Sequence, residues 1–166
     1  MLRRSLTALT MISLAAAGCS KTADSPASNA AEADVRTAVT ALQAAIKDKD
    51  TGRLWDLLDA KSQTEADQAA AAVQGKYKAA DATGKAALEK SLGLPAADLE
   101  KLDGPGYLRT EAFRKKYQEL AESTITDVKV TGKKATVYYT EPDGDKEKFD
   151  LALRDGKWKA QLAMPK

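Results

Sequence analysis

The sequence contains no histidine and a single cysteine, Cys19, among its 166 residues. Without histidine the chain has no Ser-His-Asp or Cys-His nucleophile system, no histidine-ligated metal site and no imidazole base. With one cysteine it forms no internal disulfide, and only carboxylates would remain to bind zinc, which is uncommon. We therefore expect no metal and no cofactor, and any catalysis has to use Asp, Glu, Lys or Tyr.

A strong excess of charge of one sign is also missing. The chain has 26 Lys and Arg residues against 24 Asp and Glu residues, and two of the basic residues are Arg3 and Arg4 near the N-terminus. Binding to nucleic acid or to anionic lipid headgroups depends on such a basic excess. We therefore expect no nucleic-acid partner. No Gly-rich phosphate loop or Gly-x-Ser-x-Gly elbow is present either.

The N-terminal residues have the pattern of a secretory signal. Arg3 and Arg4 precede an uncharged stretch over residues 6–17, which is shorter than the roughly 20 residues that span a bilayer. The stretch ends in Leu14-Ala15-Ala16-Ala17-Gly18-Cys19, which resembles the lipobox of bacterial lipoproteins. The alternatives are an ordinary cleavable signal with a chance cysteine, or a disordered N-terminus.

The resemblance to the lipobox implies where the protein is anchored. It implies cleavage between Gly18 and Cys19, a diacylglyceryl group on the Cys19 sulfur, and often a further acyl chain such as palmitate on its amino group. Ser20 after the cysteine implies sorting to the outer membrane, with the domain facing the periplasm. We thus expect a signal peptide over residues 1–18, a lipidated cysteine with a flexible linker over 19–33, and one domain over 34–166.

Helices are expected over the first two-thirds of this domain. Asp34 is a suitable N-cap for a helix whose apolar stripe recurs at Val35, Val39, Leu42 and Ile46. The motif Ser62-Gln63-Thr64-Glu65 fits a capping box at the start of a longer helix, and Thr110 fits the cap of a later one. Gly104-Pro105-Gly106 predicts a break.

After Glu122 the apolar period changes from 3.6 to 2, which predicts strands. Gly132-Lys133 suits a type II′ hairpin turn and Asp155-Gly156 a type I′ turn. These turns set Val128 opposite Val137 and Leu153 opposite Trp158, and would also pair Phe149 with Leu162, all on one face. The prediction is an α+β domain in which N-terminal helices cover the apolar face of a C-terminal four-stranded antiparallel meander.

This arrangement resembles the nuclear transport factor 2-like superfamily, which includes ketosteroid isomerase. The resemblance rests on two stretches, residues 44–58 with their helix, acidic turn and second helix, and the final hairpin over residues 149–160. It implies a cone-shaped fold in which helices close over a curved sheet, used as a ligand pocket or simply as a core. The alanine-rich segment over residues 63–102 departs from the family pattern, and no catalytic residue is carried over.

Three aromatic residues are candidates for lining such a pocket, namely Trp55, Tyr138 and Trp158, and ordinary core or strand packing explains each of them as well. We expect a cavity to be mainly apolar, with at most one or two carboxylates or tyrosines. The preferred hypothesis is a membrane-tethered, non-enzymatic domain that binds a small apolar ligand or a protein partner. The alternatives are an acid-base enzyme that uses Asp, Glu or Tyr, and a structural or regulatory envelope factor without a ligand.

Overall fold

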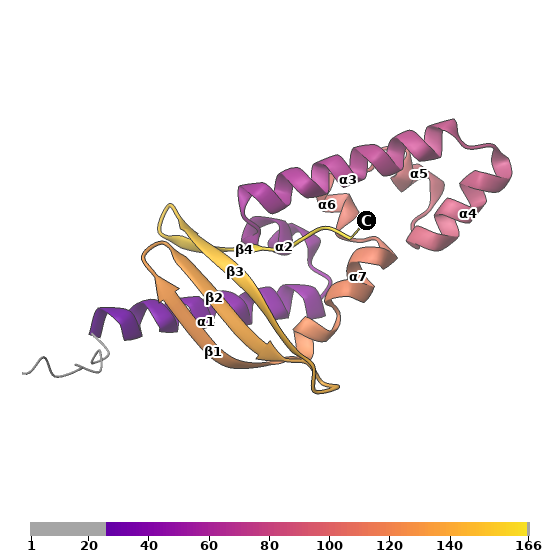
Figure 1. Cartoon of the computed structure of the whole chain (residues 1–166). Helices are drawn as coiled ribbons and strands as arrows, with labels where there is room; N and C mark the ends of the chain where they lie inside the picture. The colour runs from indigo at the N-terminus through magenta and orange to yellow at the C-terminus, as the bar shows by residue number, and fades with distance from the viewer. Residues whose placement is uncertain (1–25, 166) are drawn as a thin grey trace, which may run out of the picture.

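The computed structural model describes residues 26–165, and the predicted signal peptide and Cys19 lie outside the described residues. Its element order confirms an α+β domain with the sheet at the C-terminal end (Figure 1). The helices are α1 (Pro26–Lys47), α2 (Thr51–Leu57), α3 (Ala60–Ala79), α4 (Ala82–Leu92), α5 (Ala96–Leu99), α6 (Gly104–Tyr107), α7 (Glu111–Tyr117) and the 3₁₀ turn η1 (Glu119–Glu122). The strands are β1 (Thr124–Thr131), β2 (Lys134–Thr140), β3 (Lys146–Arg154) and β4 (Lys157–Gln161).

The four strands form an antiparallel sheet in the order β1-β2-β3-β4, which confirms the predicted meander. Both predicted turns are present, with positive φ at Gly132 (60°), Asp155 (49°) and Gly156 (74°). The resulting register pairs Val128 with Val137 and Leu153 with Trp158, as expected. The predicted pair Phe149–Leu162 is wrong, because pairing between β3 and β4 stops at Asp150 and Gln161.

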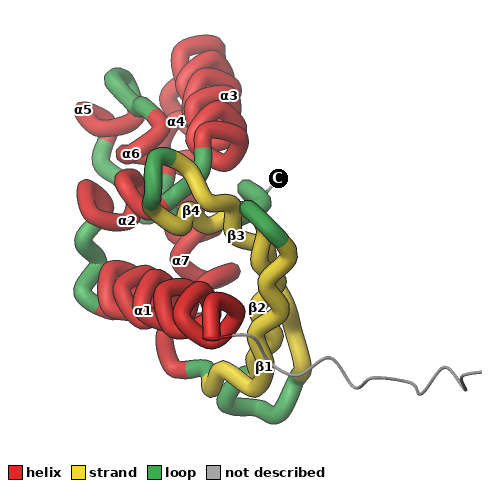
Figure 2. Tube along the Cα trace, turned by 90° about the vertical axis from the view of Figure 1, so that its left-hand side faces the viewer, coloured by secondary structure: helices red, strands yellow, loops and turns green. Residues whose placement is uncertain are grey.

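Helix α1 runs alongside the sheet, and helices α2 to α6 gather on the β4 side (Figure 2). Val35, Val39 and Leu42 are at most 1% exposed, so the predicted stripe is the core-facing side of α1. The helix begins at Pro26, eight residues before the Asp34 that we expected to cap it. Residues 26–33 lack large apolar side chains but are rich in alanine, the best helix former, and they extend a helix that packing further along already stabilises.

Two other helix boundaries differ from the predictions. Asp59 rather than Ser62 caps α3, since its Oδ1 accepts a hydrogen bond of 2.8 Å from the Ser62 N–H. Gly104-Pro105-Gly106 forms the one-turn helix α6 instead of a break, with Asp103 as its N-cap. The cap at Thr110 is confirmed, because its hydroxyl oxygen accepts from the Phe113 N–H at 3.4 Å.

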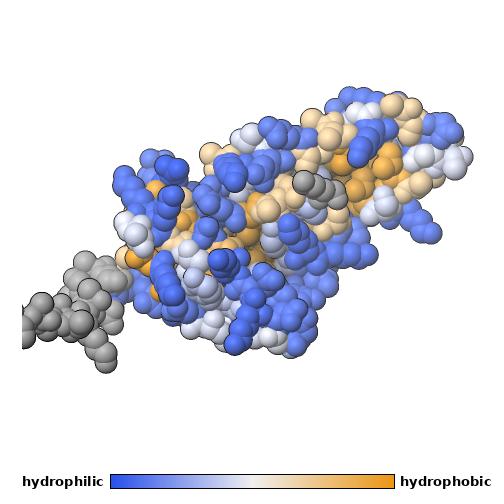
Figure 3. Space-filling model, viewed as in Figure 1, coloured by the Kyte–Doolittle hydropathy of each residue, from blue (hydrophilic) through white to orange (hydrophobic). Residues whose placement is uncertain are grey.

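Helices α3 and α4 extend away from the sheet as an arm (Figure 1). In the space-filling view, hydrophobic surface gathers over this arm, whereas the sheet is covered mainly by hydrophilic side chains (Figure 3). The half-buried apolar residues on α3 and α4 are Ala69, Val73, Leu88 and Leu92. Among the residues that the structure describes, no helix combines the length and the apolar character that crossing a bilayer requires.

Candidate binding cleft at the open edge of the sheet

Strand β4 is shorter than β3 and leaves part of the β3 edge uncovered. The last pair between the two strands is Asp150 with Gln161, although β3 begins four residues earlier, at Lys146. Residues 146–149 therefore pair with β2 on one side and, within residues 26–165, with no strand on the other. A free sheet edge carries backbone N–H and C=O groups that can pair with another extended chain.

The register shows which backbone groups face the open side. The Leu153 N–H donates to the Lys133 carbonyl, so the backbone groups of Leu153 point toward β2. Successive residues of an antiparallel strand alternate between neighbours. The backbone groups of Glu147 and Phe149 consequently form hydrogen bonds with β2, whereas those of Lys146 and Lys148 face the uncovered edge.

The C-terminal segment leaves the sheet because α6 and α7 bind its carbonyls. In a continued ladder Ala163 would stand opposite Lys148, but its carbonyl instead accepts hydrogen bonds from Tyr117 Oη (2.6 Å) and Lys116 Nζ (2.9 Å). The Tyr107 hydroxyl likewise donates to the Pro165 carbonyl at 2.6 Å. The segment is thus held against the helices, and Lys148 is left without its strand partner.

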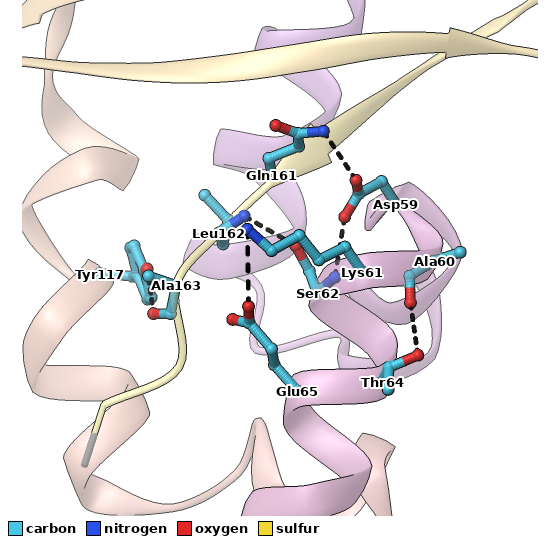
Figure 4. A network of polar contacts seen from close by, with 10 residues as sticks. All are labelled: Asp59, Ala60, Lys61, Ser62, Thr64, Glu65, Tyr117, Gln161, Leu162 and Ala163. Carbon is cyan, nitrogen blue, oxygen red and sulfur yellow. Dashed lines mark hydrogen bonds and ion pairs between the residues drawn. The ribbon is translucent and has the colours of Figure 1, made fainter.

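A group of hydrogen bonds among Asp59, Ser62, Gln161 and Leu162, here called the polar joint, fixes the point where the C-terminal segment leaves the sheet (Figure 4). The Leu162 N–H donates to Ser62 Oγ at 2.9 Å, and Gln161 Nε2 donates to Asp59 Oδ2 at 2.9 Å. Asp59 and Ser62 are 5% and 2% exposed, so both groups are buried and both are satisfied. The Asp59 N–H also donates to the Ala160 carbonyl at 2.9 Å, so backbone and side-chain hydrogen bonds together join the start of α3 to the end of β4.

An open cleft of about 590 Å³ lies where the C-terminal segment and β3 separate. Its floor consists of the buried side chains of Tyr117, Leu120, Tyr139, Phe149 and Leu162. The Tyr139 and Phe149 rings meet edge-on, with centroids 5.8 Å apart. Burial raises the pKa of Tyr139 to about 12 and also raises the pKa of Tyr117, so both hydroxyls stay protonated at neutral pH.

The rim of this cleft is more polar than expected from the sequence. Its lining residues include four acidic ones, Glu65, Glu141, Glu147 and Asp150, and three basic ones, Lys61, Lys116 and Lys148. Two of the ammonium groups are already engaged, Lys61 with Glu65 at 3.8 Å and Lys116 with the Ala163 carbonyl. The expectation of at most one or two carboxylates or tyrosines is wrong for this cavity.

One end of the cleft is acidic. Carboxylate oxygens of Glu119, Glu141 and Asp143 lie within 4.8 Å of one another, and none of these residues belongs to an ion pair among residues 26–165. Partial burial and the neighbouring carboxylates, Glu119 foremost, raise the pKa of Glu141 above its ordinary value. Such oxygens are ligands of hard cations, and the geometry equally suits a cationic side chain from a partner.

The three aromatic residues predicted from the sequence do not line this cleft. Trp158 is 7% exposed in the core, and Trp55 is half-buried against α6. Tyr138 lies on the outer face of the sheet, where the Lys129 ammonium stands 5.0 Å from its ring centroid. The sequence reasoning missed Tyr117 and Tyr139, although the alternation that buried Val137 and Phe149 also placed Tyr139 on the inner face.

No protein-family model, curated protein or solved structure matches the chain significantly.

Proposed function

We propose that this protein is a lipid-anchored envelope lipoprotein whose domain binds an extended segment of a partner protein in the cleft. The segment adds as a strand to β3 where β4 ends. In this proposal the lipid on Cys19 holds the domain near the membrane, at the outer membrane and facing the periplasm, and the helices and curved sheet form a cone of the nuclear transport factor 2-like kind.

The observation that carries the proposal is the uncovered edge of β3 beside an open cleft. Residues 146–149 offer the backbone groups of Lys146 and Lys148 to an added strand, as the antiparallel register requires. Strand addition gains affinity from main-chain hydrogen bonds and specificity from pockets for alternate side chains. The apolar floor beside Phe149 supplies such a pocket.

The charges around the cleft indicate what the segment carries. Alternation places Glu147 on the inner face with Phe149, whereas the side chains of Lys146 and Lys148 point to the outer face. Glu141 and Glu147 both line the cleft, and carboxylate oxygens of Glu119 and Glu141 lie within 4.8 Å of each other. The inward positions of a matching segment are therefore apolar near Phe149 and basic near Glu141.

The test uses a capped hexapeptide with valine at the inward-facing positions beside Phe149, lysine at the inward-facing position beside Glu141, and threonine at the outward-facing positions. It is titrated calorimetrically into the purified protein. Lys148→Pro removes the N–H that faces the open edge and leaves the bonds to β2 intact, a position where strands tolerate proline. We expect affinity to fall about fivefold or more, since one hydrogen bond contributes about 1 kcal/mol. Lys148→Gln is the matched control, because it removes the charge but keeps the N–H.

Hydrogen exchange provides a second readout that needs no partner. The Lys148 amide should exchange much faster than the amides of Glu147 and Phe149, and it should become protected when the peptide is added. Protection of Lys148 in the free protein would show that the edge is already covered. Equal binding of the same peptide with glutamate in place of lysine would contradict the charge assignment.

Glu141 favours a second candidate, an acid-base enzyme, because a carboxylate with a raised pKa in a cleft is typical of catalytic sites. Tyr139 lines the same cleft and is the nearest candidate for a neutral proton donor. An activity that Glu141→Gln abolishes, with peptide binding unchanged, would establish catalysis as the function in place of binding.

Anchoring is tested separately with Cys19→Ser. Two or three acyl chains, each contributing about 0.8 kcal/mol per buried CH₂, hold a protein stably on a bilayer, whereas one chain does not. We expect the variant to remain unprocessed or to become soluble in cell fractionation. A Cys19→Ser protein that is still processed and membrane-bound would contradict the lipoprotein assignment, and recovery in the inner membrane alone would contradict the predicted sorting.

A further inference from the structure

A second cavity, the helical groove, lies between the end of α1, the start of α2, α7 and the connection from α4 to α5. It has a volume of about 250 Å³. Its floor is formed by apolar side chains that are at most 8% exposed, namely Ala45, Leu54, Leu94, Leu108, Phe113 and Tyr117. The groove is thus a preformed apolar recess in the helical part of the domain, separate from the β3 edge.

The charged residues that line the groove are all basic, although the Glu111 carboxylate lies close by, next to Gly93. Lys49, Arg109 and Arg114 line it, all three are exposed, and no carboxylate is among its lining residues. Arg109 is partly neutralised by Asp98 at 3.2 Å, whereas Lys49 and Arg114 form no ion pair within the described part of the chain. In a chain with almost equal numbers of acidic and basic residues, this segregation creates a local positive potential over an apolar recess.

The backbone holds Lys49 in place above the groove. The residue has a left-handed φ of 57°, and its N–H donates to the Ile46 carbonyl at 3.2 Å. The following Asp50 N–H donates to the Ala45 carbonyl at 3.0 Å, which closes the turn after α1. The position of the Lys49 side chain at the rim is therefore set by the turn between α1 and α2.

We infer that the helical groove binds a small anionic amphiphile, with a carboxylate at the basic rim and a short acyl or aryl body in the recess. A group of water size takes about 30 Å³ in a liquid, so 250 Å³ accommodates about eight such groups. Apolar burial supplies the affinity, and the cations select the charge of the head group. This chemistry is opposite to that of the acidic end of the cleft, where Glu119, Glu141 and Asp143 belong to no ion pair among residues 26–165.

Three probes with the same eight-carbon chain test the inference, namely octanoate, octanol and octylammonium. Each is titrated into the full-length protein while amide chemical shifts of Ile46, Leu94 and Arg114 are followed. We expect octanoate to bind more tightly than octanol and octylammonium to bind most weakly, with the largest shifts in the groove. Equal affinities, or shifts that map to the β3 edge instead, would overturn the inference.

The variant Lys49→Gln/Arg114→Gln removes the two cations that lack an ion pair. We expect octanoate to bind about five- to tenfold more weakly, since exposed charge pairs contribute up to about 1 kcal/mol each, and octanol to bind as before. Lys133→Gln/Arg154→Gln is the matched control, because it removes the same charge from exposed hairpin positions. An equal loss of octanoate affinity in both double variants would refute recognition of the carboxylate by the cations of the groove. Unchanged octanoate affinity in Lys148→Pro would show that octanoate does not bind at the β3 edge.

Discussion

Replacing Ser62 with alanine tests the joint between α3 and β4. Ser62 is 2% exposed, and its Oγ is the acceptor for the Leu162 N–H at 2.9 Å. The substitution leaves this buried donor without a partner, which costs about 1–3 kcal/mol of unfolding free energy. Because Asp59 caps α3, the helix itself keeps its N-terminal cap in the variant.

The matched control is Ser91→Ala on α4. Ser91 is exposed, and its hydroxyl donates only to the Leu88 carbonyl of its own helix at 3.1 Å. Both substitutions gain the same helix propensity, so the difference between them isolates the bond to Leu162. We expect Ser91→Ala to stay within about 0.5 kcal/mol of the wild type.

Urea denaturation at equilibrium measures both variants. A lower midpoint with an unchanged slope for Ser62→Ala is the expected result, because the change in stability does not alter the surface exposed on unfolding. The Leu162 amide should also exchange faster with solvent. If Ser62→Ala is as stable as Ser91→Ala, the buried N–H has another partner and the proposed joint is wrong.

Three further substitutions test the core and the acidic end of the cleft. Trp158→Ala should lower the unfolding free energy by about 3–5 kcal/mol in thermal or urea denaturation, because the side chain is 7% exposed, and a mild effect would exclude it from the core. Gly104→Ala should destabilise by about 1–3 kcal/mol, since a Cβ there would stand 2.5 Å from the Trp55 ring, and Trp55→Leu in the same chain should relieve part of the loss. Glu141→Gln should stabilise the protein slightly at pH 7, because the neutral amide removes a carboxylate whose charge burial and the neighbouring Glu119 disfavour. The pKa of Glu141 is raised in the folded state, so the native protein holds a proton at this carboxyl more tightly than the unfolded chain does. The wild type therefore loses stability as the pH rises through and above the ordinary carboxyl pKa. The stability gained by Glu141→Gln should accordingly vanish below about pH 4, where the carboxyl is protonated in both states.

Local rules were sufficient to predict the sheet. The φ preferences of Gly132 and of Asp155-Gly156 fix both hairpin turns, and each turn determines the pairing of the residues beside it. The alternation of apolar residues then assigns Val137 and Trp158 to the same face without any distant information. The register was therefore predictable except at its far end, beyond Gln161.

The end of β4 was not predictable, because it depends on contacts between residues far apart in sequence. The Ala163 carbonyl bonds a tyrosine 46 residues earlier, and Leu162 bonds a serine 100 residues earlier. Ser62 illustrates the same difficulty, since its sequence fits a capping box as well as Asp59 fits a cap. In the structure Asp59 caps α3, and the Ser62 hydroxyl oxygen accepts the hydrogen bond from the Leu162 N–H after β4. Which of the two residues caps the helix depends on the tertiary position of Leu162.

Tyr117 belongs to both cavities and links them. Its ring packs against Phe113, with centroids 4.8 Å apart, and lines the cleft and the helical groove alike. Its hydroxyl holds the Ala163 carbonyl, which keeps the C-terminal segment away from β3 and leaves the Lys148 N–H open. Burial raises the pKa of this hydroxyl, so it remains a proton donor throughout the neutral range. A ligand in the helical groove that shifts the Tyr117 ring would therefore act on the hydrogen bond to Ala163 and change the affinity of the cleft for an added strand. Thermodynamic linkage then requires that strand addition at β3 change the affinity of the groove for its ligand by the same factor.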